Sequence, residues 1–168
     1  KLEPYLSNNP LAHAEVNAIL ALEKTIKPSS CTLYTTTEPC PLCMGALRMA
    51  GFVKAVYACR DPWAGCSSMT ESVPYLKNKK RRVEYLGNED LENVLVALLL
   101  ASDIIRGFSD DFFESWLKVV PAATRLAQAL YETQKLKHLR QENVTAKEML
   151  EVIKMLIVKK NLDDISTG

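Results

Sequence analysis

The pattern that most constrains the fold is a strand, a helix and a second strand joined by short links. Residues 31–36 and 53–58 are rich in β-branched and aromatic side chains, which predicts two strands. Between them, residues 40–50 predict a short helix that opens beside Pro41 and ends at Gly51, a residue suited to a left-handed cap. Short links favour parallel strands with a right-handed crossover, so we predict an α/β fold.

Periodicity predicts the elements on either side of this unit. Residues 11–26 predict a helix, with Asn8 or Asn9 as its cap and Pro10 in its first turn. A loop over 59–69, a short helix over 72–76 and a strand over 82–86 follow. Beyond Gly87 the pattern is helical, over 91–105, 111–119, 122–139 and 146–158. Thr145 and Glu148 form a candidate capping box for the last helix.

Charge and hydropathy narrow the class of protein. The 168 residues carry 21 Lys and Arg against 20 Asp and Glu, which argues against bulk electrostatic binding of long nucleic acid. One dense basic run can form a local patch that binds phosphate groups, or it can be a solvated loop. This run consists of Lys77, Lys79, Lys80, Arg81 and Arg82. The longest apolar run, residues 94–101, is far short of the roughly 20 residues that span a membrane. With no secretory signal at its start, we expect a cytoplasmic protein without a membrane partner.

Two short clusters carry the chemistry: His13-Ala-Glu15, and Pro39-Cys40-Pro-Leu-Cys43. One imidazole and two thiolates suit a zinc ion (Zn²⁺), and three protein ligands leave the fourth tetrahedral position for water. Cys40 and Cys43 lie one turn apart at a helix N-terminus, which favours the thiolate form. Glu15, two residues from His13, can then move a proton between water and a departing amine. The pattern predicts a catalytic zinc site.

Each cluster alone has a plainer interpretation. His13 can be a core histidine, and the Cys40/Cys43 pair can be a redox pair or half of a structural zinc site. A structural site needs a fourth ligand, but the only other histidine is His138 in the helical tail. The remaining cysteines lack a second close pair and read as small buried residues: Cys31, Cys59 and Cys66. The joint pattern therefore favours the catalytic site.

The resemblance to a known family extends beyond these clusters. The segments LAHAEVNAI (11–19), TLYTTTEPCPLCMGA (32–46), ACRD (58–61) and RVE (82–84) resemble the cytidine-deaminase-like superfamily, in particular its tRNA adenosine deaminase and guanine deaminase branch. The resemblance implies a three-layer α/β/α sandwich, with zinc on His13, Cys40 and Cys43, and with Glu15 as the proton shuttle. It also implies candidate substrate contacts at Asp61 and Trp63, and weaker candidates at Asn17 and Glu38.

One departure from the family concerns the N-terminus. Members usually place a helix and two strands, including a base-orienting Asn, before the His-x-Glu helix, whereas only residues 1–12 precede His13 here. Asn8 and Asn9 lie too near the helix for that role, and Leu2 stands about where the Asn is expected. We expect that upstream residues are missing from the sequence, or else that another chain supplies the missing strands, since a three-stranded sheet leaves an exposed edge.

Together these observations predict a zinc-dependent deaminase domain over residues 1–120 and a C-terminal helical extension over 121–168 packed on the core. We expect hydrolytic deamination of a free nucleobase or nucleoside, with the tail restricting access to small molecules, and a homodimer. One alternative is a tRNA-specific adenosine deaminase, favoured if the basic run lines the approach to zinc. The other is a catalytically silent zinc domain whose tail binds a protein partner.

Overall fold

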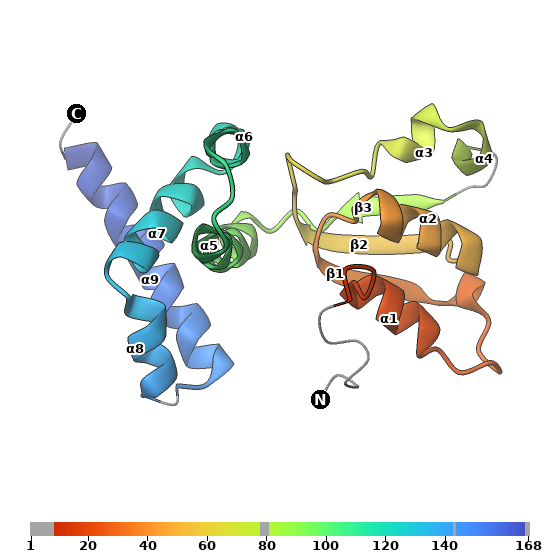
Figure 1. Ribbon diagram of the computed structural model, residues 1–168, viewed down its shortest axis with the longest axis horizontal. Coiled ribbons are helices and arrows are strands. Elements are labelled where there is room, and N and C mark those ends of the chain that lie inside the picture. The colour runs from red at the N-terminus through yellow and green to blue at the C-terminus, as the bar shows by residue number, and fades with distance from the viewer. Residues whose placement is uncertain (1–8, 78–80, 143, 167–168) are drawn as a thin grey trace. The chain divides into compact units, whose positions relative to one another are not determined.

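A three-stranded parallel sheet organises the first half of the chain (Figure 1). The computed structural model describes residues 9–77, 81–142 and 144–166. In the sheet, β1 (Thr32–Thr37), β2 (Lys54–Cys59) and β3 (Arg82–Tyr85) run parallel in that order, with Thr32 level with Lys54 and Lys54 level with Arg82. The predicted strands and the α/β class are therefore confirmed.

Helix α2 (Pro41–Ala50) makes the crossover between β1 and β2. It ends at Gly51, whose φ of 94° is the left-handed conformation that favours glycine. Its inner face joins the two strands in one core cluster of the buried residues Leu33, Met44, Leu47, Phe52 and Ala55. The buried face thus fixes the orientation of α2 on the sheet.

Helix α1 is shorter than predicted and begins later, over Ala14–Leu20 instead of 11–26. Asn9 caps a turn and not the helix, because its Oδ1 accepts a hydrogen bond from the Leu11 amide at 2.9 Å; Asn8 lies outside the described residues. His13 is the N-cap residue, with an extended backbone (φ −61°, ψ 149°). A short 3₁₀ helix (Pro28–Ser30) leads from α1 toward β1.

The connection from β2 to β3 holds two short helices where one was predicted over 72–76. These are α3 (Met69–Ser72) and α4 (Pro74–Lys77). The break falls at Val73, which has an extended backbone because it precedes Pro74.

The second half of the chain is helical, as predicted. It contains α5 (Glu89–Arg106), α6 (Asp110–Val119), α7 (Pro121–Glu132), α8 (Lys135–Gln141) and α9 (Ala146–Ser166). The helix predicted over 122–139 is in fact two, because the chain turns at Gln134, where φ is 53°. The capping box is confirmed, since Thr145 donates to Glu148 Oε2 and the Glu148 amide donates to Thr145 Oγ1. None of the described helices is long and apolar enough to cross a membrane.

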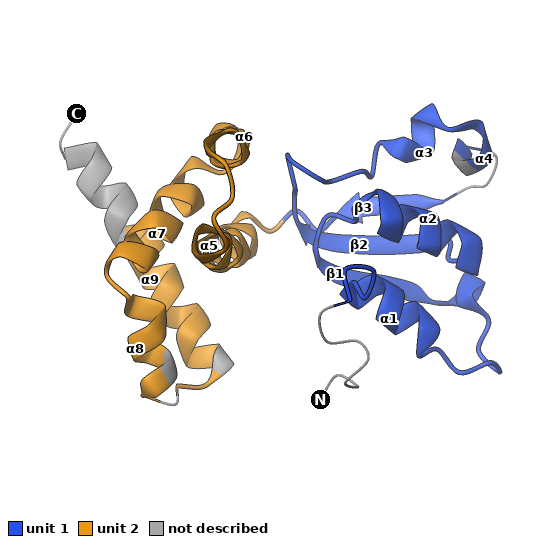
Figure 2. Cartoon of the chain, viewed as in Figure 1, with its two compact units in different colours: residues 1–87 blue, residues 88–168 orange. Residues whose placement is uncertain are grey.

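Contacts divide the chain into two compact units, Lys1–Gly87 and Asn88–Gly168 (Figure 2). Helices α5 and α6 both pack on α7, and both fall in the second unit. The extent of the deaminase domain, and the packing of a tail over 121–168 on it, stay predictions.

Burial of α2 on the sheet should dominate the stability of the first unit. Leu47 is 4% exposed in the core cluster, whereas Met49 on the same helix is 75% exposed. We expect Leu47→Ala to lower the free energy of unfolding by about 2–5 kcal/mol, because it leaves a cavity. Met49→Ala, the matched control, should change it by less than about 0.5 kcal/mol. Denaturant titration followed by circular dichroism measures both, and equal effects would contradict this account of the core.

Candidate metal centre

The three predicted metal ligands come together at the beginnings of two helices. His13 is the N-cap residue of α1, Cys40 is the N-cap residue of α2, and Cys43 lies in the first turn of α2. Because α2 follows β1 directly, both sulfurs lie beyond the carboxyl end of that strand. Among the described residues, these three form a cluster of side chains able to hold a metal ion.

The distances among the three ligand atoms fit one metal ion. Nδ1 of His13 lies 3.5 Å from Sγ of Cys40 and 3.4 Å from Sγ of Cys43, and the two sulfurs are 3.6 Å apart. Tetrahedral zinc, with bonds of about 2.3 Å to sulfur and 2.0–2.1 Å to nitrogen, separates two sulfurs by about 3.8 Å and sulfur from nitrogen by about 3.5 Å. The three atoms therefore form one face of a zinc-sized tetrahedron, and no fourth ligand from the described residues completes it.

The electrostatics of the cluster also call for a cation. Cys43 is 1% exposed, and its burial, together with the nearby Glu15 carboxylate, raises the pKa of its thiol. Two thiols and a carboxylate in contact cannot all ionise without a positive charge among them. The donor set thus fits zinc, which binds thiolate and imidazole together.

Glu15 lies beside the cluster, held by a residue of the sheet. Thr35 Oγ1, on β1, donates a hydrogen bond of 2.6 Å to Glu15 Oε1, and Glu15 Oε2 lies 3.3 Å from Sγ of Cys43. One carboxylate oxygen is therefore fixed by the protein, while the other faces the metal ligands. A carboxylate placed in this way can accept a proton from a molecule at the fourth corner.

Asn17 has a local role in the structure. Its side-chain amide donates to the Ala12 carbonyl at 3.1 Å, and its backbone amide donates to the His13 carbonyl at 2.9 Å. These two bonds tie the turn before α1 to the helix. Asn17 therefore helps to fix the direction in which the chain enters at His13.

The two candidate substrate contacts lie in the loop after β2. Asp61 Oδ1 accepts hydrogen bonds of 2.9 Å from the amides of Trp63 and Ala64, which makes Asp61 the capping residue of a tight turn. Trp63 is 53% exposed. Contact of either side chain with a substrate stays a prediction.

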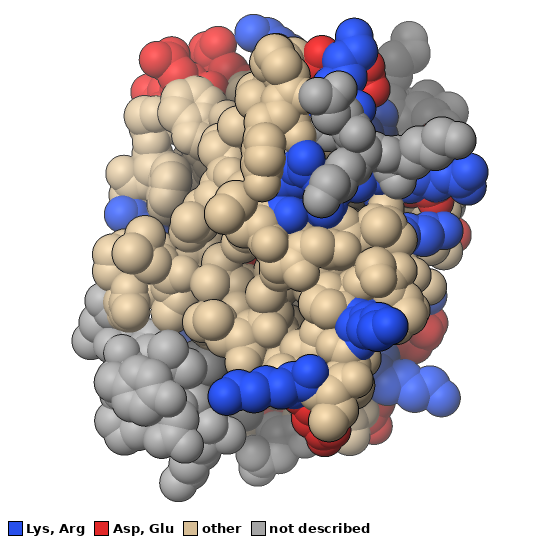
Figure 3. Space-filling view, turned by 90° about the vertical axis from the view of Figure 1, so that its right-hand side faces the viewer, with Lys and Arg blue, Asp and Glu red and all other residues tan. Residues whose placement is uncertain are grey.

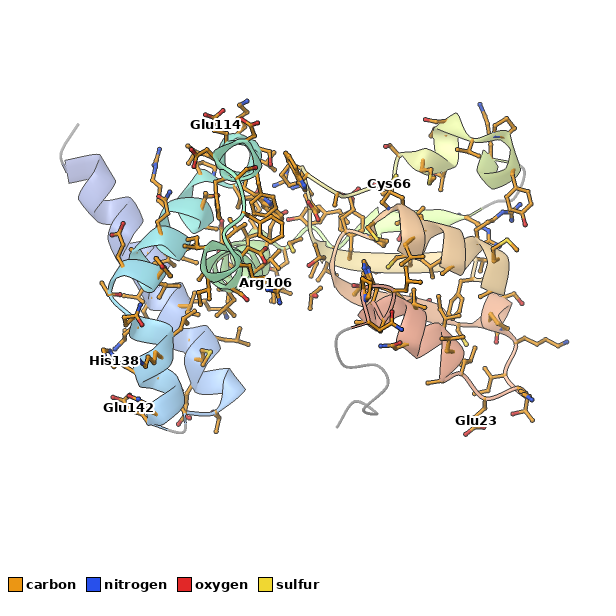
Figure 4. The ribbon with its side chains drawn as sticks, viewed as in Figure 1. Glu23, Cys66, Arg106, Glu114, His138 and Glu142 are labelled. Atoms are coloured by element: carbon orange, nitrogen blue, oxygen red, sulfur yellow. The ribbon has the colours of Figure 1, made fainter. Side chains whose placement is uncertain are left out.

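Glu38 holds this loop against the segment that leads into Cys40. Its Oε1 accepts from the amide and the hydroxyl of Ser67, and its Oε2 accepts from the Asp61 amide. Gly65 is needed there, because a Cβ at this position would lie 2.6 Å from the Glu38 carboxylate. The Cys66 amide, on the segment before α3 (Figure 4), donates to the Pro39 carbonyl. From the sequence, Glu38 is only a weak candidate for a substrate contact, and its role in the loop was not predicted; Gly65 is the residue that could have indicated it.

The second histidine, His138, and the three cysteines outside the cluster occupy other positions in the fold. His138 is on α8 in the second unit (Figure 4). None of the five cysteines, all of which lie among the described residues, forms a disulfide, and Cys59 Sγ donates to the Thr36 carbonyl. Among the described residues, the cluster keeps three protein ligands, which is the open arrangement of a catalytic zinc site.

Within the first unit, Arg81 and Arg82 of the basic run lie away from the metal ligands. Arg81 and Arg82 lie at the amino end of β3, level with Lys54 on β2, and Lys77 ends α4. The metal ligands follow the carboxyl end of β1, one strand length away, roughly 17 Å. Lys79 and Lys80 lie outside the described residues.

The part of the chain that holds the cluster is similar to a known family of zinc-binding regions. Residues 4–59 match the family model described as the cytidine and deoxycytidylate deaminase zinc-binding region. This match spans all three ligands and Glu15. No solved structure gives a significant match.

Three curated relatives are each similar to part of the chain. Guanine deaminase from Bacillus subtilis is 39% identical over 72 residues, which are 41% of this chain and 46% of the relative. The tRNA-specific adenosine deaminase of the same organism is 40% identical over 60 residues, 34% of this chain and 37% of the relative. A probable cytosine deaminase from Schizosaccharomyces pombe is 41% identical over 46 residues, 27% and 28% of the two chains. The chain thus spans less than half the length of these relatives.

The zinc content of purified variants tests the ligand set. We expect about one zinc per chain in the unaltered protein and loss of most of it in His13→Ala, Cys40→Ser and Cys43→Ser, because each removes one of three protein ligands. Cys31→Ser is the matched control, since Cys31 bonds to the Lys27 carbonyl and not to the cluster. Atomic emission spectrometry measures the zinc. Full zinc content in a ligand variant would disprove the assignment.

The raised pKa of the Cys43 thiol predicts a pH dependence of metal binding. A thiol with a raised pKa is protonated at neutral pH, so zinc must displace that proton when it binds. Zinc affinity should therefore rise with pH through the neutral range, and binding should release protons. Calorimetric titrations in buffers of different ionisation enthalpy measure the release. An enthalpy that is the same in every buffer would show that the thiols are already ionised.

Proposed function

We propose that this chain is a zinc-dependent hydrolytic deaminase of a free nucleobase or nucleoside, because residues 4–59 match the family model of the cytidine and deoxycytidylate deaminase zinc-binding region. One observation carries the proposal. The ligand atoms of His13, Cys40 and Cys43 form one face of a tetrahedron, and the Glu15 carboxylate lies against that group.

The roles of the residues follow from this arrangement. His13, Cys40 and Cys43 would hold zinc, which when bound lowers the pKa of water to around 7 and so supplies a nucleophile at neutral pH. Glu15 takes a proton from the attacking water as the oxygen bonds to the ring carbon that carries the amine. The Glu15 carboxylic acid gives this proton to the adjacent ring nitrogen. Glu15 then takes the proton of the added hydroxyl and passes it to the amine, so that the carbon–nitrogen bond breaks and ammonia leaves with a carbonyl in its place.

Thr35 acts as a positioning residue for this proton transfer. Its hydroxyl donates to Oε1 of Glu15 and leaves Oε2 to face the metal ligands. A side chain fixed at one oxygen needs little reordering when it moves a proton from water to the substrate.

A small substrate is favoured over tRNA by the charge distribution. The formal net charge is only +1. The described part of the basic run lies at the amino ends of the strands, whereas the metal ligands lie at the carboxyl end of β1. A tRNA substrate would need basic side chains along its approach to the metal centre, to bind its phosphates. Arg81 and Arg82 do not lie on that approach. The alternative, tRNA-specific adenosine deamination, rests on the similarity to that enzyme from Bacillus subtilis.

The placement of Glu15 argues against a catalytically silent zinc domain that only binds a protein partner. A structural zinc site does not require a carboxylate that is hydrogen-bonded to the sheet and lies outside the ligand set. Such a carboxylate is the feature that hydrolytic chemistry requires.

We further propose that the protein works in the cytoplasm as a homodimer. Side chains that stay exposed on the second unit include the apolar residues Ile105, Leu117, Tyr131, Met155 and Val158. Apolar groups of this kind favour burial against another chain. Sedimentation velocity at micromolar concentration tests the dimer, and a monomer across that range would contradict it.

Ammonia release tests the activity and the role of Glu15. The zinc-loaded protein is assayed with free bases, nucleosides, nucleotides and tRNA, and we expect turnover of one base or nucleoside. Glu15→Gln should keep its zinc and lose roughly 100- to 10,000-fold in turnover, because it cannot carry the proton. Glu23→Gln is the control, since Glu23 is an exposed carboxylate after α1.

The outcomes of this assay are distinct. Turnover of tRNA alone would replace the small-molecule substrate with the alternative. Full turnover by Glu15→Gln would disprove the proton shuttle. Zinc bound without turnover of any substrate would favour the partner-binding role.

A further inference from the structure

A buried arginine without enough partners lies at the far end of α2 from the cysteines. Arg48 is 5% exposed. One terminal nitrogen donates to the Tyr75 carbonyl, and the guanidinium lies over the Tyr75 ring at 4.3 Å from its centre. Its Nε and Nη1 are buried and have no hydrogen-bond partner. Buried N–H groups of a charged side chain are normally paired.

A second arginine faces the same place. Arg81 Nη1 donates to the Leu47 carbonyl at 2.9 Å, and Arg81 Nε is also buried without a partner. Burial, and next the positive charge of Arg48, lower the pKa of Arg81. Three nitrogen atoms on two neighbouring cations, Arg48 Nε, Arg48 Nη1 and Arg81 Nε, thus lack an acceptor.

No described carboxylate balances these charges in the pocket that the two arginines share. Its lining includes the basic residues Arg48, Lys54, Arg81 and Arg82, together with apolar residues of the core cluster, and no acidic residue. Glu84, the nearest acid along β3, is paired with Lys54 at 3.1 Å. Burying like charges without a counter-ion is unfavourable, so the arrangement calls for an anion.

The pocket is separate from the metal centre. Arg48 lies eight residues after Cys40 on α2, about 12 Å along the helix. Arg81 and Arg82 lie at the amino ends of the strands, whereas the metal ligands follow the carboxyl end of β1. Figure 3 looks onto the amino-end side, where blue Lys and Arg groups lie across the face and the red acidic groups lie at its edges. An anion bound there is not the substrate at the metal.

We propose that Arg48 and Arg81 bind one phosphoryl group, on free phosphate or on a nucleotide, at the amino ends of the strands. Guanidinium groups present paired N–H donors that match a phosphoryl group, and the unpartnered nitrogens supply donors from two side chains. The C-terminal dipole of α2 opposes an anion only weakly compared with two full positive charges. The bound group would tie α2, the α4 segment at Tyr75 and the start of β3 to one another.

The test is calorimetric titration of the zinc-loaded full chain with inorganic phosphate, at constant ionic strength set with chloride. We expect saturable binding of one phosphate in the unaltered protein. Arg48→Met should weaken it at least about tenfold, because it removes charged hydrogen-bond donors. Lys24→Met, which removes an exposed cation from the same unit, should leave it unchanged. If Arg48→Met folds poorly, Arg81→Met serves as the second variant. Broadening of the ³¹P signal of phosphate by the unaltered protein measures the same binding without any variant.

Each result decides the proposal. A nucleoside monophosphate that competes with phosphate would support it and identify a nucleotide as the source, whereas binding of free phosphate alone would support it with the ion as the source. The proposal is overturned by the absence of phosphate binding, by equal binding of acetate, by equal weakening in Lys24→Met, or by unchanged binding in both arginine variants. Binding of RNA without binding of inorganic phosphate would overturn it as well.

Discussion

The parallel pairing of β1 with β2 is the constraint on which the rest of the first unit depends. Parallel neighbours cannot be joined by a tight turn, so α2 must start where β1 ends and return the chain to the beginning of β2. The start of α2, with its two cysteines, is thereby fixed at the carboxyl end of the sheet. The buried face of the same helix closes the core, so core packing and metal geometry arise from one contact.

A second element must meet α2 to complete the ligand set. The start of α1 supplies an imidazole and a carboxylate two residues apart, and the extended backbone at His13 turns the imidazole toward the sulfurs. Thr35 then links the carboxylate to β1. A metal bound here would cross-link α1 to α2, so that metal binding and folding of this unit support each other.

The sequence predicts the parts that follow from strong local patterns, and it fails where tertiary contacts decide. The strand–helix–strand unit and the cysteine spacing are readable because proline, glycine and β-branched residues mark each boundary. The late start of α1 at Ala14 and the turn at Gln134 cannot be predicted in this way, because the apolar periodicity continues through both positions. The hydrogen bonds of Glu38 to the loop, and the proximity of Arg48 to Arg81, involve residues that are far apart in the sequence. No spacing pattern predicts such contacts.

We propose that His13, Cys40 and Cys43 hold a zinc ion whose fourth position is open, beside the Glu15 carboxylate, which moves protons. X-ray absorption at the zinc edge of the purified protein tests it most directly. We expect two sulfur ligands at about 2.3 Å and two lighter ligands at about 2.0–2.1 Å, one of them an exchangeable oxygen that a small anion displaces. Three or four sulfur ligands, or a spectrum that no added anion changes, would show a closed structural site and contradict the account.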